Sequence, residues 1–328
     1  MYLIKIFLIS FLLFSNIGFA QKKKIAYCSN QSSSGFLQIF TMNEDGSENK
    51  QLTDLPENCM KPKWSPDGKQ IVFYSDKGLV YLIRNFEQAP ETPPFYLWSG
   101  YNPSFIPSGE QVMFNGEYDD VLSIFIIDTA QFGAEPSLLS DGGYSNMQVL
   151  SNDGNKLVYS TFVAATKVIV VSDLNDTTDA YLSLVSKNDD ANLEPDISPD
   201  GSKIVYSSFD NNLKGTVRIN TNGNEIPLTK GMNSSNVPRF SPDGKNIAFV
   251  VINDKDVSLY KMDSDGNGKK DLNINGGDVG TFQWMDNERI IYDAGSDTKT
   301  SIGIVNIKTG ESDIILEGGF HLHPTIQK

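Results

Sequence analysis

One short motif returns along this chain at nearly constant spacing. The stretch WSPDGKQIVFYS at residues 64–75 has close copies at 197–208 and 240–251 and degenerate copies around Ser108, Asp153 and Asp286. Counted from Asp67 through Ser108, Asp153, Asp200, Asp243 and Asp286, the steps are 41, 45, 47, 43 and 43 residues. A period in the forties that holds several short apolar runs is typical of β-propeller blades, each of which is a four-stranded sheet.

The repeated letters have a physical reason. In Ser-Pro-Asp-Gly the proline presets φ for a tight turn, and the glycine accepts the positive φ that closes it. The motif therefore predicts the turn between the first strand of a blade, strand A, and the second, strand B. The runs that follow, such as IVFY at 71–74, are almost continuously apolar, as expected where neighbouring blades cover both faces of a sheet. Trp64, Phe240 and Trp284 recur beside the turn, which predicts packing between blades.

Seven stretches match strand B, near residues 24–29, 69–75, 110–115, 155–160, 202–208, 245–251 and 288–293. The first of them, KKKIAYCS at 22–29, has no strand A before it, whereas the final HLHPTIQK at 321–328 matches the strand A sequence CMKPKW at 59–64. We predict an all-β, seven-bladed propeller of four-stranded antiparallel blades, in which the C-terminal strand completes the N-terminal blade. Six blades are the alternative.

The first twenty residues predict a signal peptide. Lys5 precedes the apolar run IFLISFLLF, and small residues end at Ala20. The run is too short for a membrane span of about 20 residues, so we expect cleavage near Ala20, a periplasmic or secreted location, and one propeller domain over residues 21–328. The formal charge of −14 disfavours nucleic acid and anionic membranes as partners. We expect a monomer.

Two tracts carry a family resemblance. MNEDGSENKQLT at 42–53 and WSPDGKQIVFYSD at 64–76 resemble the exported TolB-like propeller proteins, and the resemblance covers almost all of the chain after residue 20. It implies a propeller fold. It leaves the function open, because similar repeats occur in periplasmic scaffolds, in the lids of prolyl-oligopeptidase-like hydrolases and in pectin-fragment lyases.

Few motifs here carry chemistry. G-x-S-x-G, HExxH and P-loop sequences are absent. His321 and His323 are two residues apart on a predicted strand A, so we expect both side chains on one face, where Glu194 or Asp278 could complete a Zn²⁺ or Mn²⁺ site. The alternative is a pair of hydrated or hydrogen-bonded histidines at the mouth of the channel.

Two further features are weaker. DSDGNGKKD at 263–271 offers Asp263, Asp265, Asn267 and Asp271 at the spacing of a calcium loop, but the stretch aligns with NEDGSENKQ at 43–51, which predicts an ordinary hairpin. Calcium is thus a minor alternative to having no cofactor. Cys28 and Cys59 are expected near the same rim and form a candidate disulfide, with two unpaired buried thiols as the alternative.

In a propeller the strands A line the central channel, and the loops from strand D to the next strand A open on one rim. Polar residues that differ from blade to blade precede or begin these strands. The candidate ligand-binding residues are Tyr101, Asn102, Asn192, Glu194, Asn236, Asp278, His321 and His323. Our leading hypothesis is a non-catalytic binding or scaffold propeller of the cell envelope that engages a protein or glycan partner at this rim. The alternatives are a metal-assisted, lyase-like carbohydrate enzyme at His321 and His323, and a structural subunit whose ring is empty.

Overall fold

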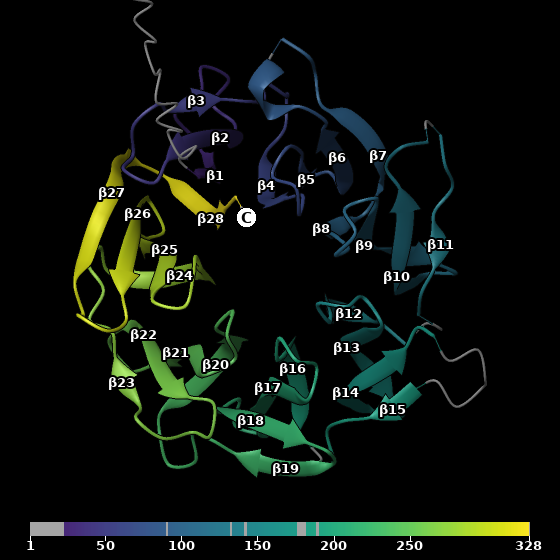
Figure 1. The fold of residues 1–328 in the computed structure, drawn as a ribbon, viewed down its shortest axis with the longest axis vertical. Coiled ribbons are helices and arrows are strands. Elements are labelled where there is room, and N and C mark those ends of the chain that lie inside the picture. Colours follow the sequence, from purple (N-terminus) through teal and green to yellow (C-terminus); the bar gives the residue numbers. More distant parts are fainter. Residues whose placement is uncertain are drawn as a thin grey trace, which may run out of the picture.

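A computed structural model describes residues 23–89, 91–131, 133–140, 143–175, 182–187 and 190–327. Within these ranges the strands form seven four-stranded antiparallel sheets arranged in a ring (Figure 1), so the prediction of seven blades is confirmed. The predicted signal peptide and its cleavage near Ala20 lie outside the described residues. No helix in the described ranges is long and apolar enough to cross a membrane.

The blades are numbered here in ring order. Blade 1 contains β28 (His321–Ile326), β1 (Lys24–Ser29), β2 (Gln38–Asn43) and β3 (Lys50–Gln51). Blade 2 contains β4 (Cys59–Trp64), β5 (Ile71–Ser75), β6 (Leu79–Ile83) and β7 (Phe95–Ser99), with the short 3₁₀ helix η1 (Phe86–Gln88) between its last two strands. Blade 3 contains β8 (Tyr101–Phe105), β9 (Gln111–Tyr118), β10 (Val121–Asp128) and β11 (Ser137–Leu138). Blade 4 contains β12 (Asn146–Leu150), β13 (Lys156–Val163), β14 (Thr166–Asp173) and β15 (Leu182–Leu184).

The remaining three blades follow the same order of strands. Blade 5 contains β16 (Ala191–Ile197), β17 (Lys203–Phe209), β18 (Gly215–Thr221) and β19 (Asn224–Pro227). Blade 6 contains β20 (Ser234–Phe240), β21 (Asn246–Ile252), β22 (Val257–Asp263) and β23 (Lys270–Asp271). Blade 7 contains β24 (Asp278–Trp284), β25 (Arg289–Ser296), β26 (Lys299–Asn306) and β27 (Ser312–Gly319).

The ring closes through both ends of the chain. Strand β28 pairs antiparallel with β1, with Ile326 opposite Ile25 and His321 opposite Ser29. The last strand is therefore the innermost strand of blade 1, and the predicted closure is confirmed. Closing the ring in this way gives blade 1 an inner strand that its own N-terminal segment cannot supply.

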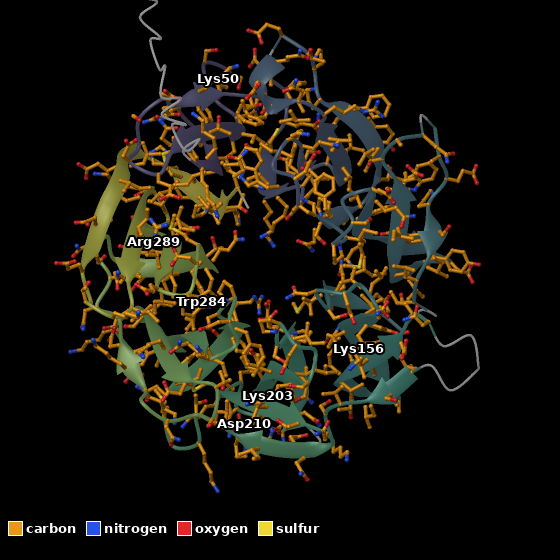
Figure 2. All side chains as sticks on the ribbon, in the orientation of Figure 1. Lys50, Lys156, Lys203, Asp210, Trp284 and Arg289 are labelled. Carbon is orange, nitrogen blue, oxygen red and sulfur yellow. The ribbon has the colours of Figure 1, made fainter. Side chains whose placement is uncertain are left out.

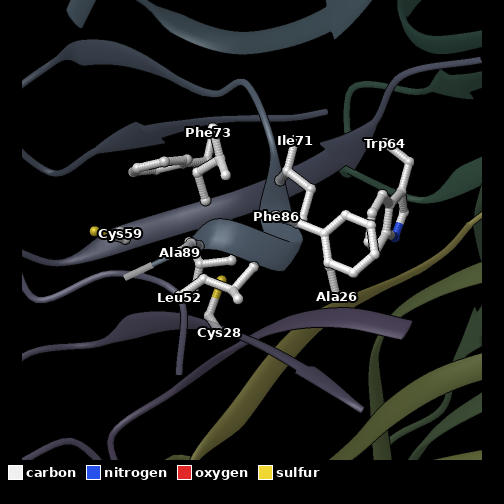
Figure 3. Packing of buried hydrophobic residues seen from close by; sticks show 11 residues of the cluster. Ala26, Cys28, Leu52, Cys59, Trp64, Ile71, Phe73, Phe86 and Ala89 are labelled. Carbon is white, nitrogen blue, oxygen red and sulfur yellow. The ribbon is translucent and has the colours of Figure 1, made fainter. Parts of the chain in front are cut away.

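The core lies between the blades. The described residues form seven apolar clusters, and each cluster draws its buried side chains from two neighbouring blades. The predicted aromatic positions belong to this packing: Trp64, Phe240 and Trp284 are all buried. In the cluster of Figure 3, the rings of Trp64 and Phe86 meet edge to face with their centroids 5.0 Å apart. The indole of Trp284 donates to the Arg239 carbonyl of the preceding blade, at the boundary visible in Figure 2.

The repeated turns form as predicted, with hydrogen bonds that explain their letters. In the turn of blade 5, Ser198 Oγ donates to Asp200 Oδ1 at 2.6 Å and accepts from Lys203 N at 2.9 Å. Asp200 Oδ1 also accepts from Ser202 N, and Gly201 has a φ of 69°. The hydrogen bonds from Ser198 and Ser202 lower the pKa of Asp200 to about 2. The same serine-to-aspartate bond recurs at Ser65–Asp67, Ser151–Asp153 and Ser241–Asp243.

Candidate functional site: the D-to-A rim

The D-to-A rim is one end of the ring, formed by the loops from strand D to strand A and by the hairpins that join strands B and C. Antiparallel blades place these two sets of connections at the same end. A hydrogen bond demonstrates this in blades 3 and 4: Ser145 N, in a D-to-A loop, donates to the carbonyl of Leu122 beside a B–C hairpin, at 2.8 Å. The Ser-Pro-Asp-Gly turns occupy the opposite end.

Every inner strand carries a β-bulge near this rim. The bulge is seen as a shift in the pairing register between strands A and B in all seven blades. In six blades the bulge contains a residue with left-handed backbone. These residues are Lys61, Asn102, Met147, Glu194, Val237 and His323, with φ between 48° and 56°. Left-handed backbone costs about 1–2 kcal/mol for a residue with a side chain, so contacts between blades must hold these positions.

Two such contacts cross a blade boundary: one is a hydrogen bond between side chains and the other is an ion pair. Lys61 Nζ donates to Asn102 Oδ1 at 3.1 Å, which links blades 2 and 3. The guanidinium of Arg239 in blade 6 forms an ion pair with Glu194 of blade 5 at 2.8 Å. Burial raises the pKa of the neighbouring Asp196 to about 6. The charge of Arg239 and a hydrogen bond from Phe240 N lower this pKa, but by less than burial raises it.

Blade 7 differs from the other blades. Its bulge is one position earlier in the inner strand, nearer the rim, so that Gly280 and Thr281 lie opposite Asp293. Asp293 is 1% exposed and accepts from Thr281 N, from the Thr281 hydroxyl and, across the boundary to blade 1, from His323 N at 2.9 Å. Burial raises the pKa of Asp293 to about 6, although the hydrogen bonds from Thr281 and His323 act in the opposite direction.

The expectation that His321 and His323 share one face is wrong. His321 is fully buried, its Nδ1 lies 3.0 Å from Ser29 Oγ, and its ring contacts Tyr27. His323 instead approaches Cys28, with 3.9 Å between Nδ1 and Sγ. Because Cys28 alternates with Tyr27 and Ser29 along β1, the two imidazoles lie on opposite faces of the blade. The bulge at His323 breaks the alternation on which the expectation rested.

Neither histidine is placed to act as a cation or as half of a metal site. Burial lowers the pKa of His321, and burial together with Lys61 and Lys63 lowers that of His323 to about 4. No group of three or more His, Cys, Asp or Glu side chains within the described ranges is placed to hold one metal ion. The proposed third ligands are engaged elsewhere, Glu194 with Arg239 and Asp278 with the backbone of Val257.

The other predicted rim residues fall into two groups. Tyr101, Asn102 and Asp278 are exposed, and Asn236 and Glu194 are half-buried, so these five are accessible from the rim. Tyr101 packs edge to face on Tyr74 of the preceding blade. Asn192 is fully buried and donates to the carbonyls of Lys167 and Asp190, which makes it a structural residue.

The candidate disulfide is not formed, since both cysteines are free and buried. Cys28 lies toward His323, whereas Cys59 lies against Gln38 and Thr53, with 3.7 Å from its Sγ to Gln38 Oε1. Each thiol is therefore fixed by different partners within the cluster between blades 1 and 2. Burial raises the pKa of Cys28, and it raises the pKa of Cys59 to about 12.

The calcium-type stretch is the hairpin between β22 and β23, as its alignment with residues 43–51 predicted. Asp263 N donates to the Asn267 carbonyl at 2.8 Å, and Asn43 N makes the same bond to Ser47. Asp265 pairs with Lys203, and Asp271 Oδ1 accepts from Asn273 N. Asp265 and Asp271 thus have separate partners, and no group of three or more His, Cys, Asp or Glu side chains gathers around a common point in this described hairpin.

The sequence reasoning missed a group of exposed apolar side chains on the rim. Fifteen large apolar side chains are exposed among the described residues, and eight of them lie at the D-to-A rim. Leu174 and Leu182, on either side of the connection from strand C to strand D in blade 4, lie at the opposite end. The eight are Phe36, Tyr101, Tyr118, Tyr144, Phe162, Val163, Leu213 and Ile252. Apolar residues at the tips of B–C hairpins, where polar turn residues are usual, are the signal that could have revealed them.

Comparison with known proteins agrees with this architecture. Dipeptidyl-peptidase 5 of Porphyromonas gingivalis is 23% identical over 319 residues, which cover 86% of this chain and 44% of that protein. The Tol-Pal system protein TolB of Francisella tularensis subsp. holarctica is 27% identical over 238 residues, 70% of this chain and 53% of that protein. The chain therefore spans about half the length of these relatives.

Among solved structures, TolB from Acinetobacter baumannii superposes with a TM-score of 0.59 at 14% identity, over 93% of this chain and 66% of that one. A family model of the TolB beta propeller domain matches residues 24–284 and 133–327. Since these matches span nearly all of the described chain, the protein belongs to the TolB beta propeller domain family.

Proposed function

We propose that this protein is an exported, non-catalytic propeller that binds a partner protein of the cell envelope at its D-to-A rim. The observation that carries the proposal is the uneven distribution of exposed apolar side chains, eight at this rim against two at the other end. Exposed apolar surface is costly in water unless a partner covers it. At the opposite end, the Ser-Pro-Asp-Gly turns bond their own polar groups to one another, as in blade 5.

The relatives support the class of partner. TolB proteins are named for the Tol-Pal system, and they match this chain over 70% of its length. The dipeptidyl-peptidase relative points toward peptides instead, but the match covers less than half of that enzyme. The lyase-like alternative at His321 and His323 has lost its geometric basis, because the two rings lie on opposite faces of blade 1.

Affinity capture with matched variants tests the proposal. A tagged protein comprising residues 21–328 is incubated with solubilised envelope from its own organism, and retained proteins are identified by mass spectrometry. The rim variant carries Phe36→Ser, Tyr101→Ser, Tyr144→Ser and Leu213→Ser. The control variant carries Leu138→Ser, Leu174→Ser, Leu184→Ser and Ile226→Ser, which are also exposed but lie away from the rim.

We expect the rim variant to keep its melting temperature and lose the partner that the wild type and the control variant retain. Equal retention by all three proteins would place the binding surface elsewhere. Retention of a glycan in place of a protein would keep the rim as the site and change the class of partner.

A further inference from the structure

The exposed apolar residues of the rim are concentrated on blades 3 and 4, in what we call the aromatic band: Tyr118, Tyr144 and Phe162. Their exposed fractions are 56%, 54% and 43%. Tyr118 ends β9, Phe162 lies at the end of β13, and Tyr144 lies in the D-to-A loop between the two blades. Val163, also exposed, extends the band beyond Phe162.

Backbone hydrogen bonds connect the segments that carry the band. Ser145 N donates to the Leu122 carbonyl, and Leu122 lies opposite Glu117 in the β9–β10 hairpin that presents Tyr118. On the other side, Phe162 N donates to the Gly143 carbonyl at 2.9 Å. The rings of Tyr144 and Phe162 meet edge to face with their centroids 6.5 Å apart. The segment 143–145 therefore connects the tips of two adjacent blades.

Three carboxylates accompany the aromatic rings. Glu117, Asp119 and Asp120 flank Tyr118, and all three are exposed. Asp119 and Asp120 form a left-handed two-residue turn with φ of 52° and 62°. In the described structure none of these side chains takes part in a hydrogen bond or ion pair. In the corresponding hairpin of blade 5, by contrast, Asp210 Oδ1 accepts from Asn212 N and Lys214 N and so serves its own turn.

The band already holds one cation. Lys167 Nζ lies 4.9 Å from the centroid of Phe162 and donates to the Tyr144 carbonyl at 3.0 Å. An ammonium or guanidinium group over an aromatic face is attracted by the ring quadrupole. The intramolecular contact shows that the geometry of this surface suits a positive group beside an aromatic ring.

Resting on the proposed function, we propose that the aromatic band and its three carboxylates bind an extended, basic segment of the partner protein. Arginine or lysine side chains of such a segment lie beside the rings of Tyr118 and Tyr144 and pair with Glu117, Asp119 and Asp120, whereas the Phe162 ring keeps its contact with Lys167. The formal charge of −14 attracts a basic segment and repels an acidic one. The rest of the rim makes further contacts with the partner protein.

The test uses three fluorescein-labelled decapeptides in which glycine alternates with arginine, glutamate or serine, and measures binding to the full chain by fluorescence anisotropy. We expect the arginine peptide alone to bind, with its Kd rising by about tenfold or more between low and physiological salt. The triple variant Tyr118→Ser, Tyr144→Ser, Phe162→Ser should weaken binding by about tenfold or more. The single variant Tyr118→Ser, at the most exposed of the three positions, should also weaken binding of the arginine peptide, by a smaller factor.

The carboxylate variant carries Glu117→Gln, Asp119→Asn and Asp120→Asn, since asparagine tolerates the left-handed turn. Its control carries Glu110→Gln, Asp313→Asn and Glu317→Gln, which removes the same charge far from the band. We expect binding of the arginine peptide to fall by about tenfold in the first variant and by less than about twofold in the second. Equal losses in both would show attraction by net charge alone and overturn the proposal.

Two further outcomes would also overturn it. Stronger binding of a neutral hexasaccharide, such as chitohexaose, that depends on the band would make the occupant a glycan. Loss of envelope capture in the rim variant, together with no binding of the arginine peptide, would leave the proposed function standing and remove the band as the site for a basic segment.

Discussion

Replacing Asp293 by alanine tests how the ring is held closed. The carboxylate belongs to β25 of blade 7, and it accepts from His323 N on β28, the strand that completes blade 1. It also accepts from the backbone and the hydroxyl of Thr281. One buried side chain thus joins the two blades that meet where the ends of the chain come together.

The expected loss follows from the donors left behind. Asp293→Ala strands the amides of Thr281 and His323 and the Thr281 hydroxyl in a region where the carboxylate is 1% exposed. An unsatisfied buried donor costs about 1–3 kcal/mol, and three donors lose their acceptor here. We therefore expect the free energy of unfolding to fall by about 3–5 kcal/mol at pH 4.5, and by less at pH 7.5, where the wild type already bears the cost of a buried charge.

The pH dependence provides a second readout. Because burial raises the pKa of Asp293 from 3.8 to about 6, the folded state holds the proton more tightly than the unfolded state. The associated stability is complete below about pH 4 and is lost as the pH rises through about 6. The rise in pKa corresponds to a change on the order of 3 kcal/mol. Asp196, whose pKa is also raised to about 6, adds a similar decline.

The assay is urea denaturation followed by tryptophan fluorescence at pH 4.5, 6.0 and 7.5. The wild type should become less stable across this range, and Asp293→Ala should lose about half of that decline because Asp196 still titrates. Asp297→Ala, at an exposed carboxylate in the β25–β26 hairpin of the same blade, should change stability by less than about 0.5 kcal/mol. Wild-type midpoints and an unchanged pH profile in Asp293→Ala would refute the role of this carboxylate in closure.

Three further outcomes are expected. Deleting residues 321–328 removes β28 and uncovers Ile25 and Tyr27, so the product should aggregate or melt well below the wild type; the milder Ile326→Ala should cost about 2–4 kcal/mol in a denaturation experiment. Ser198→Ala removes two turn hydrogen bonds and should cost about 1–2 kcal/mol, and NMR titration should find the pKa of Asp200 raised from about 2 toward 3.8; an unchanged pKa would contradict the turn geometry. Both thiols should resist a thiol reagent in the native protein and react only after unfolding, without reduction, whereas one fast-reacting native thiol would argue against the buried positions of Cys28 and Cys59.

The sequence predicted those parts of the fold that depend on local chemistry. Proline, aspartate and glycine specify a turn through their own backbone preferences, and seven repeats of that turn with its apolar strand specify seven blades. The similarity between residues 59–64 and 321–326 was enough to predict closure, because a strand without partners in its own segment must pair elsewhere. Trp64 and Trp284 were assigned correctly to the packing between blades because their position repeats.

The site was harder to predict, as residues in the inner strands show. A proline follows the left-handed residue at Lys61, Asn102, Glu194, Val237 and His323, and this recurrence marks the place of the bulge in the sequence. Lysine and valine nevertheless have no preference for that conformation, and the residue before a proline normally favours extended backbone. Pairing with strand B and contacts from the next blade impose it, so strict alternation misplaced His323 relative to His321.

The sequence by itself determined the number of blades, the closing strand and the turns, because each follows from preferences encoded within a few residues and then repeated. Only the tertiary structure decided that Cys28 and Cys59 have different partners, that Asp293 bonds across the boundary between blades 7 and 1, and that the segments carrying Tyr118, Tyr144 and Phe162 are joined at the rim. These features join residues from different strands or neighbouring blades. Their contacts depend on bulges and blade packing, which fix where a side chain points only after the whole ring has formed.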